Sequence, residues 1–238
     1  MCTVTLIPTQ ENGFILTSNR DEAINRKTLV PEFYQVDKTR MLFPKDAVAG
    51  GTWIGLSDKN TMICLLNGGF EIHERLVSYR QSRGVVVKDL LGADDLQKAI
   101  LEYNYKGIEP FTIVAANWQS DLEFFELVWD GKEKHFRVLE KETHIWSSST
   151  LYTNKMKKTR EDWFGVFEEE NVLTSDALLD FHKNAGIGDK DVDLQIDRGF
   201  LKTRSITQIV KNEEESTMRY EDLQNTEVNI VAFEAITV

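Results

Sequence analysis

The chain has 238 residues, of which 41% are apolar and 28% are charged. These proportions are ordinary for a soluble globular protein, and the sequence holds no run of about 18 apolar residues that would span a bilayer. The formal net charge is −11 at pH 7, and the basic residues are scattered along the chain. Nucleic acid and other polyanions are therefore disfavoured as partners.

The N-terminal segment and the cysteines bear on location and on metal binding. The segment lacks the basic region of a secretory signal, and its apolar run ends at Pro8, so we expect a cytoplasmic or organelle-matrix location, with cytoplasmic as the first choice. Cys2 and Cys64 lie far apart and outside metal-binding spacings, and Cys64 is expected to be a buried strand thiol. We expect no metal site and no cofactor, because the four histidines are dispersed; they are His73, His135, His144 and His182.

The chain opens with a pattern typical of a β-hairpin. Residues 1–7 and 14–22 are rich in β-branched and apolar side chains, and an Asn-Gly pair between them favours a turn. With a tight turn the numbers of paired residues sum to about 25, whereas a looser loop, caused by the proline before it, lowers the sum to about 22. Over this range Cys2 lies opposite a residue between Arg20 and Ala23.

The next third of the chain predicts a connection, a second hairpin and two helices. Residues 23–49 contain two prolines and no sustained hydrophobic period, so we expect a long surface connection. Residues 48–56 and 61–66 predict the second hairpin. Residues 71–91 predict a helix that is interrupted at a glycine, and 94–103 predict a shorter helix.

The rest of the chain predicts an antiparallel meander, two helices and three more strands. The meander strands are expected at 111–117, 122–129, 134–139 and 143–147. The helices are expected at 154–169 and 175–184, the second capped by Ser175. The last strands are expected at 205–210, 216–220 and 228–238. The pattern indicates an α+β class with much antiparallel sheet, and no linker or repeat divides residues 1–238, so we expect a single domain.

Cys2 offers chemistry that depends on its place in the chain. Once the initiator methionine is removed, this residue has both a thiol and an α-amine, with ordinary pKa values of ~8.5 and ~8. The amine can then take the proton of the thiol at neutral pH without a histidine. Arg20 would favour the thiolate, and Asp21 would hold the ammonium form. The alternative is a small apolar strand residue at Cys2 and an exposed ion pair at Arg20 and Asp21, worth under about 1 kcal/mol.

Several motifs together resemble a known family. Cys2, followed by a strand, a turn and the run Asn-Arg-Asp-Glu at 19–22, resembles the NRDE family, the transport and Golgi organisation family. That family is similar to N-terminal-nucleophile hydrolases such as the choloylglycine hydrolases. The stretches 50–55 (Gly-Gly-Thr-Trp-Ile-Gly), 65–67 (Leu-Leu-Asn) and 203–207 (Thr-Arg-Ser-Ile-Thr) fit the same family. The resemblance implies a four-layer α/β/β/α sandwich.

The resemblance also implies a set of site residues. The catalytic residues would be Cys2, Arg20, Asp21, Asn67 and Arg204. Of these, Asn67 would stabilise an oxyanion, or else be a turn residue before two glycines, and Arg204 would anchor a substrate carboxylate or orient the site. The substrate-binding residues would be Asn19, Glu22, Trp53 and Ser148.

We therefore predict an N-terminal-nucleophile cysteine hydrolase that cleaves a non-peptide C–N amide bond of a small acylated substrate through Cys2. The alternative is a binding or trafficking protein of the family that handles lipid, acyl-CoA or haem without turnover. Ser148 supports this alternative, because related sequences have an asparagine there. A serine hydroxyl still donates one hydrogen bond.

Overall fold

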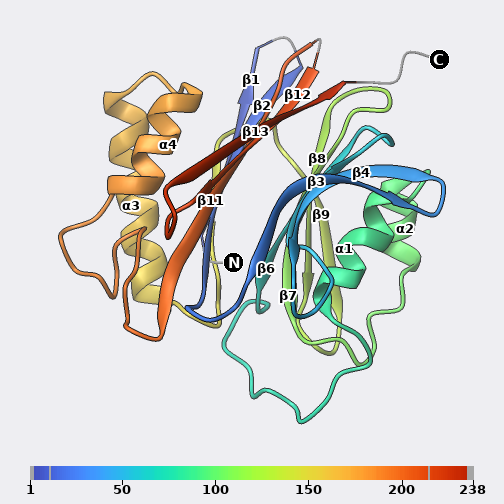
Figure 1. Cartoon of the computed structure of the whole chain (residues 1–238), viewed down its shortest axis with the longest axis horizontal. Helices are drawn as coiled ribbons and strands as arrows, with labels where there is room; N and C mark the ends of the chain where they lie inside the picture. The colour runs from blue at the N-terminus through green and yellow to red at the C-terminus, as the bar shows by residue number, and fades with distance from the viewer. Residues whose placement is uncertain (1–2, 11, 214, 235–238) are drawn as a thin grey trace. The chain divides into compact units, whose positions relative to one another are not determined.

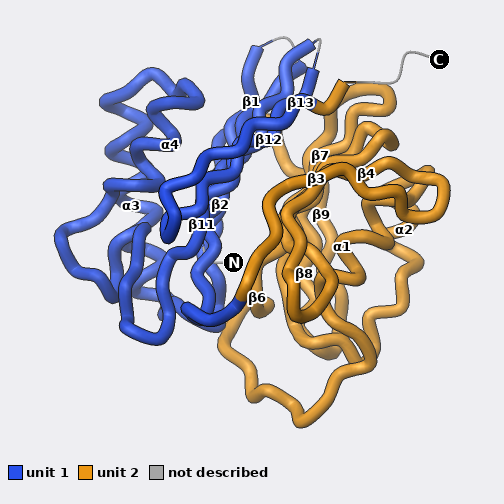
Figure 2. Tube along the Cα trace, in the orientation of Figure 1, with its two compact units in different colours: residues 1–26, 142–232 blue, residues 27–141, 233–238 orange. Residues whose placement is uncertain are grey.

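The computed structural model describes residues 3–10, 12–213 and 215–234, and over these residues the fold is α+β with two sheets and four helices (Figure 1). The chain divides into two compact units (Figure 2). Unit 1 comprises residues 1–26 and 142–232, and unit 2 comprises residues 27–141 and 233–238. The expectation of a single domain stays a prediction.

Unit 1 is built on a six-stranded sheet with the order β10-β1-β2-β11-β12-β13. Its strands are β1 (Thr3–Thr9), β2 (Gly13–Ala23), β10 (His144–Ser147), β11 (Leu201–Lys211), β12 (Glu215–Asp222) and β13 (Glu227–Glu234). The helices α3 (Asn154–Glu170) and α4 (Ser175–Asn184) lie side by side and contact this sheet. Phe164 of α3 and Phe181 of α4 pack with Ile7 and Ile15, so apolar side chains hold the helices against β1 and β2.

The N-terminal hairpin forms as predicted, with the looser of the two expected turns. Thr3 pairs with Asn19 and Thr9 pairs with Gly13, so the numbers of paired residues sum to about 22. Asn12 has a φ of 52°, which is the left-handed conformation that a turn asparagine tolerates. Cys2 lies outside the described residues.

Unit 2 is built on a seven-stranded sheet in which every strand pairs with its neighbour in sequence. The strands are β3 (Thr28–Val36), β4 (Thr39–Asp46), β5 (Ile54–Ser57), β6 (Thr61–Asn67), β7 (Phe111–Asn117), β8 (Glu123–Trp129) and β9 (Lys134–Leu139). The helices are α1 (Arg83–Leu91) and α2 (Leu96–Glu102), and α1 contacts β5 and β6. Cys64 is buried on β6, as predicted.

The expected surface connection at 23–49 is wrong, because β3 and β4 occupy most of it. Both prolines that argued against strands occupy positions that make no ladder pair. Pro31 lies in a register shift between Leu29 and Glu32, and Pro44 lies opposite this shift on β4. A proline has no N–H to donate, so it fits a strand only at such an irregularity or at an edge.

Three further expectations need correction. The helix predicted at 71–91 is wrong over its first part: α1 covers only Arg83–Leu91, and residues 71–82 form no helix. Gly84 does not interrupt that helix; it lies in the first turn of α1, where an added Cβ would lie 2.8 Å from the backbone oxygen of Thr52. The strand β10 pairs with β1 and not with the predicted meander. The cap of α4 is Thr174, whose hydroxyl accepts the N–H of Ala177 at 3.2 Å.

Over the described part of the chain, no helix combines the length and the apolar character needed to cross a membrane.

Candidate functional site

The predicted charged residues of the run 19–22 lie on β2, between β1 and β11. Arg20 is 3% exposed and Asp21 is 2% exposed, so the alternative of an exposed ion pair is wrong. The hairpin places Asn19 opposite Thr3, at the start of β1. Burial of a charge costs several kcal/mol unless hydrogen bonds and opposite charges compensate, so the contacts of these two side chains decide what the site can do.

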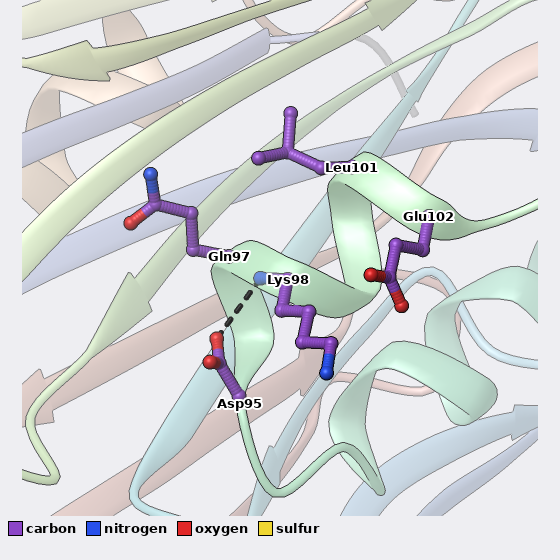
Figure 3. Close-up of a pocket in the computed structure, with 5 residues that line it drawn as sticks. All are labelled: Asp95, Gln97, Lys98, Leu101 and Glu102. Carbon is purple, nitrogen blue, oxygen red and sulfur yellow. Dashed lines mark hydrogen bonds between the residues drawn. The ribbon is translucent and has the colours of Figure 1, made fainter.

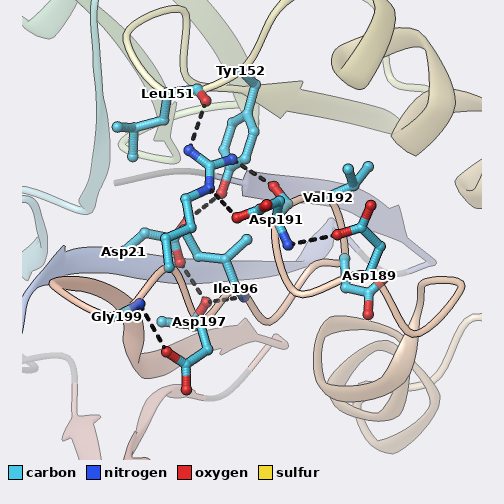
Figure 4. A network of polar contacts seen from close by, with 12 residues as sticks. Asp21, Leu151, Tyr152, Asp189, Asp191, Val192, Ile196, Asp197 and Gly199 are labelled. Carbon is cyan, nitrogen blue, oxygen red and sulfur yellow. Dashed lines mark hydrogen bonds and ion pairs between the residues drawn. The ribbon is translucent and has the colours of Figure 1, made fainter.

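Asp21 accepts hydrogen bonds from two hydroxyl groups (Figure 4). The hydroxyl of Tyr152 donates to Oδ2, and the hydroxyl of Thr203 donates to Oδ1 at 2.5 Å. Thr203 is paired with Asp21 across β2 and β11, and its oxygen also accepts the N–H of Ile196 at 2.9 Å. Both carboxylate oxygens are thus held by a hydroxyl donor.

Two guanidinium groups lie near the ring of Tyr152. The guanidinium carbon of Arg160 lies 3.6 Å from the ring centroid, and that of Arg198 lies 5.3 Å from it. Arg160 is fully buried and donates to the hydroxyl of Thr3 at 2.6 Å and to the backbone oxygens of residues 192 and 193 at 2.7–3.1 Å. A buried cation stacked on an aromatic ring is a stabilising contact that also fixes the plane of the ring.

The second guanidinium is held by the loop before β11. Arg198 donates to the backbone oxygens of Leu151 at 3.2 Å and Asp191 at 2.5 Å, and it forms an ion pair with the Asp191 carboxylate at 3.7 Å. The carboxylate of Asp189 accepts the N–H of Asp191 at 2.9 Å (Figure 4). The acidic side chains of this loop therefore order the loop around Arg198.

Arg20 and Glu22 form a second charged group on β2. A guanidinium nitrogen of Arg20 lies 3.5 Å from Oε2 of Glu22, and one of Arg26 lies 3.7 Å from the same oxygen. The other carboxylate oxygen of Glu22 accepts the N–H of Ala23 at 2.9 Å. Glu22 therefore links the buried Arg20 to the more exposed end of the strand, and its predicted contact with substrate stays a prediction.

Arg204 lies beside these residues but contacts others. The register between β2 and β11 shifts at Arg204, which is a β-bulge opposite Arg20 and Asp21. Its guanidinium donates to the backbone oxygen of Ile24 at 2.5 Å and to the side chain of Gln224. Bulges frequently redirect side chains next to active sites. The predicted catalytic role of Arg204 remains untested by these contacts.

Asn19, predicted to bind substrate, is fully buried and bonded to α4. Its amide donates to the backbone oxygens of His182 at 3.1 Å and Leu194 at 2.8 Å, and its Oδ1 lies 2.8 Å from Nδ1 of His182. The hydroxyl of Thr5 lies 2.9 Å from Nε2. Burial, and secondarily the charge of Arg160, lowers the pKa of His182 to about 3, so the ring is neutral at pH 7. These contacts give Asn19 a role in joining β2 to α4.

Ser148 occupies the position where the resemblance leads one to expect an asparagine. It is 1% exposed, and its hydroxyl lies 3.1 Å from that of Thr150. Its backbone oxygen accepts the N–H of Tyr152 at 3.1 Å, so this turn leads directly to the ring that contacts Asp21.

Asn67 and Trp53 belong to unit 2. Asn67 ends β6, opposite Phe111, and is followed by Gly68, whose φ is 87°. Trp53 is 5% exposed and directly precedes β5. Gly51 is explained by packing, because it approaches Gly84 of α1 so closely that an added Cβ would lie 2.9 Å from the Gly84 Cα. Gly50 has a φ of 68°, which favours glycine.

A family model for transport and Golgi organisation 2 matches residues 1–229. The chain belongs to the transport and Golgi organisation 2 family. This confirms the resemblance given by the motifs at 19–22, 50–55 and 203–207. No curated protein matches this family member by sequence.

Solved structures similar to this family member include an amidase, a hydrolase and an acylase. An N-acylethanolamine-hydrolyzing acid amidase ortholog from Caenorhabditis elegans is similar with a TM-score of 0.59 and 11% identity, over 87% of this chain and 92% of that one. A variant of the conjugated bile acid hydrolase from Clostridium perfringens is similar with a TM-score of 0.56 and 10% identity, over 97% of this chain and 92% of that one. Penicillin V acylase from Agrobacterium tumefaciens is similar with a TM-score of 0.54 and 10% identity, over 100% of this chain and 87% of that one. The expected fold of N-terminal-nucleophile hydrolase type is confirmed.

The transport and Golgi organisation 2 motifs did not identify every polar residue around Asp21. Tyr152, Arg160 and Arg198 were missed, and each reaches the site from a segment far from β2 in sequence. Arg160 lies in a predicted helix among charged neighbours, a pattern that is typical of a solvent-exposed residue. Tyr152 could have been considered from the sequence, because it closely follows the serine run at 147–149, which includes the predicted site residue Ser148.

A surface depression in unit 2 is unrelated to the predicted residues. It has a volume of about 240 Å³ and is lined by exposed side chains of α2 and its cap (Figure 3). The lining residues are Asp95, Gln97, Lys98, Leu101 and Glu102. Among the described residues no group of three or more His, Cys, Asp or Glu side chains lies close enough to hold a metal ion. The expectation of no metal and no cofactor stays a prediction.

Proposed function

We propose that this chain is an N-terminal-nucleophile cysteine hydrolase that cleaves a non-peptide C–N amide bond of a small acylated molecule through Cys2. The observation that carries the proposal is the buried pair Arg20 and Asp21 beside the start of β1. Cys2 directly precedes Thr3 in the sequence. Thr3 pairs with Asn19, the residue before this buried pair.

The proposed reaction has two stages. The α-amine of Cys2 takes the thiol proton, the sulfur bonds to the substrate carbonyl carbon, and the C–N bond breaks as the amine passes its proton to the leaving nitrogen. Water, deprotonated by the same amine, then attacks the thioester and releases the carboxylic acid and the thiol. Arg20 favours the thiolate, and Asp21 orients the ammonium form.

The roles of the other predicted residues follow the resemblance. We assign oxyanion stabilisation to Asn67, orientation of the site to Arg204, and substrate contacts to Glu22, Trp53 and Ser148. Asn19, with its amide bonded inside unit 1, is the least suited of the predicted residues to contact a substrate. We also propose a single cytoplasmic domain that acts on a small molecule and not on nucleic acid, without a metal or other cofactor.

The names of the similar structures support hydrolysis of an acyl bond. They are an acylase, a conjugated bile acid hydrolase and an acid amidase. At identities of 10–11% the likeness concerns the fold, so the substrate has to be found by experiment.

The test is acylation of the protein by a panel of activated amides and thioesters, read by intact mass. The wild-type chain should lack Met1 and gain one acyl group, and Cys2→Ala should not be acylated. Cys64→Ala is the matched control, because Cys64 is buried on β6 and should leave the acylation of Cys2 unchanged. Equal acylation of the wild type and Cys2→Ala, or retention of Met1 on the cellular protein, would contradict the mechanism.

Ser148 favours a second candidate, a binding or trafficking protein that handles lipid, acyl-CoA or haem. Its buried hydroxyl lies against Thr150, in place of the amide group that related sequences have there. If this candidate is right, Cys2→Ala will bind such a ligand as tightly as the wild type, and neither protein will release a product.

A further inference from the structure

We propose that Tyr152 is a positioning residue that fixes the Asp21 carboxylate, and that Arg160 fixes Tyr152 in turn. The inference rests on the proposed function, because Asp21 matters chemically only if the α-amine of Cys2 is the base. It adds two residues, on the segment before α3 and on α3 itself, to the machinery around the start of β1.

The carboxylate of Asp21 is held from two directions. Thr203 approaches from the neighbouring strand β11, where sheet register fixes its place. Tyr152 approaches from the turn between β10 and α3, which no sheet register fixes, and bonds the other oxygen. A carboxylate with a donor on only one oxygen can rotate about its χ2 angle, because that torsion is broad. The Tyr152 hydroxyl therefore restrains the carboxylate at the oxygen that the Thr203 hydroxyl does not hold.

The ring of Tyr152 needs its own support, and Arg160 supplies it. The ring is 3% exposed and lies 3.6 Å from the guanidinium carbon of Arg160. The same guanidinium donates to the hydroxyl of Thr3, the residue that follows Cys2. One buried, rigid fork thus contacts both the residue next to the proposed nucleophile and the ring that holds Asp21. This arrangement links Asp21, which orients the ammonium form in the proposed mechanism, to the residue that follows Cys2.

The conservative variant Tyr152→Phe tests the proposal, since it keeps the ring that contacts Arg160 and removes only the hydroxyl. The first readout is a crystal structure of the resting protein, which is independent of turnover. We expect the Asp21 carboxylate to rotate away from its wild-type position while the ring stays in place. An unmoved carboxylate overturns the proposal whether or not the protein is an enzyme.

The second readout is kinetic. Misplacement of a catalytic group by about 1 Å can cost ~100-fold in rate, so Tyr152→Phe should lower kcat for acylation of Cys2 by about 10- to 100-fold with KM unchanged. Tyr103→Phe is the matched control, because the Tyr103 hydroxyl also donates to an aspartate, Asp89, in unit 2. This control should keep the wild-type kcat.

A double-mutant cycle with Asp21→Asn separates action through Asp21 from a general loss of structure. If Tyr152 acts through Asp21, adding Tyr152→Phe to Asp21→Asn should change kcat by less than about twofold. If the losses in kcat of the two single variants multiply in the double variant, the positioning role of Tyr152 is overturned. Absence of any acylation in the wild type would instead overturn the proposed function, and the crystal structure would then decide the role of Tyr152 by itself.

Discussion

The two units differ in the charged and titratable side chains that they bury most deeply. Unit 1 buries Arg20, Asp21, Arg160 and His182 at 3% exposure or less, next to an apolar cluster that joins α3 and α4 to β1 and β2. The core of unit 2 is a larger cluster of apolar side chains between its sheet and α1. Buried charges reduce stability unless they are compensated, and they gather at functional sites. Under the proposed function, the deeply buried Arg20 and Asp21 of unit 1 act on Cys2.

The largest effect is expected at Arg160. Replacing it with methionine leaves the backbone oxygens of residues 192 and 193 and the hydroxyl of Thr3 without their donor. We expect a loss of about 3–5 kcal/mol in the free energy of unfolding, measured by urea titration. Lys158→Met on the same helix, whose side chain is 68% exposed, is the control and should leave the midpoint unchanged. Equal losses of stability in the Arg160→Met and Lys158→Met variants would contradict the difference between a buried and an exposed charge.

The next effect is a pH dependence from His182. Its pKa is about 3 in the folded protein and about 6.5 when unfolded, so only the unfolded chain takes up this proton as the pH falls below 6.5. The contribution of the neutral ring to the free energy of unfolding is complete above pH 6.5. It is lost as the pH falls toward 3, by at most about 1.4 kcal/mol per pH unit.

Urea titrations of the wild type and His182→Gln between pH 7 and pH 4 measure this contribution. The variant should lose less stability on acidification than the wild type. Gln97→Ala, at an exposed side chain that does not titrate, is the control and should retain the wild-type slope over this range. Parallel slopes for all three proteins would contradict a buried, neutral His182.

A smaller effect on stability is expected in unit 2, at Gly84. An added Cβ would lie 2.8–2.9 Å from backbone atoms of Thr52, so Gly84→Ala should cost about 1–3 kcal/mol in the free energy of unfolding. Gly165→Ala in α3 is the control, because nothing lies within 4 Å of its added Cβ. That variant should gain about 0.5–1 kcal/mol, since alanine favours a helix. A stable Gly84→Ala protein would contradict the close packing of α1.

The smallest effect distinguishes the two possible caps of α4. Thr174→Ala should cost about 1 kcal/mol, because it removes the acceptor for the N–H of Ala177. Ser175→Ala should change the free energy of unfolding by less than about 0.5 kcal/mol. The reverse order would restore the cap that the sequence predicted.

Local patterns predicted much of the fold, and non-local pairing accounts for the failures. The Asn-Gly turn indicated the first hairpin and bracketed its register. The strands β3 and β4 were missed because Pro31 and Pro44 lie at a register shift that only the pairing reveals. The assignment of β10 to the meander failed because its partner, β1, lies at the other end of the chain.

The candidate site shows the same division. The run at 19–22 identified the buried Arg20 and Asp21, since the resemblance rests on those residues. Tyr152 and Arg160 act through contacts with residues more than a hundred positions away, which no local pattern encodes. The partners of Asn19 could not be predicted either, because they depend on how α4 packs against β2.

The most direct test of the central claim is tandem mass spectrometry of the protein after brief exposure to an acyl thioester. The proposed mechanism predicts a thioester-linked acyl group on an N-terminal peptide that begins with Cys2 and has lost Met1, and no acyl group on Cys64. An acyl group on Cys64 or on lysines only, with the N-terminal peptide unmodified, would contradict it.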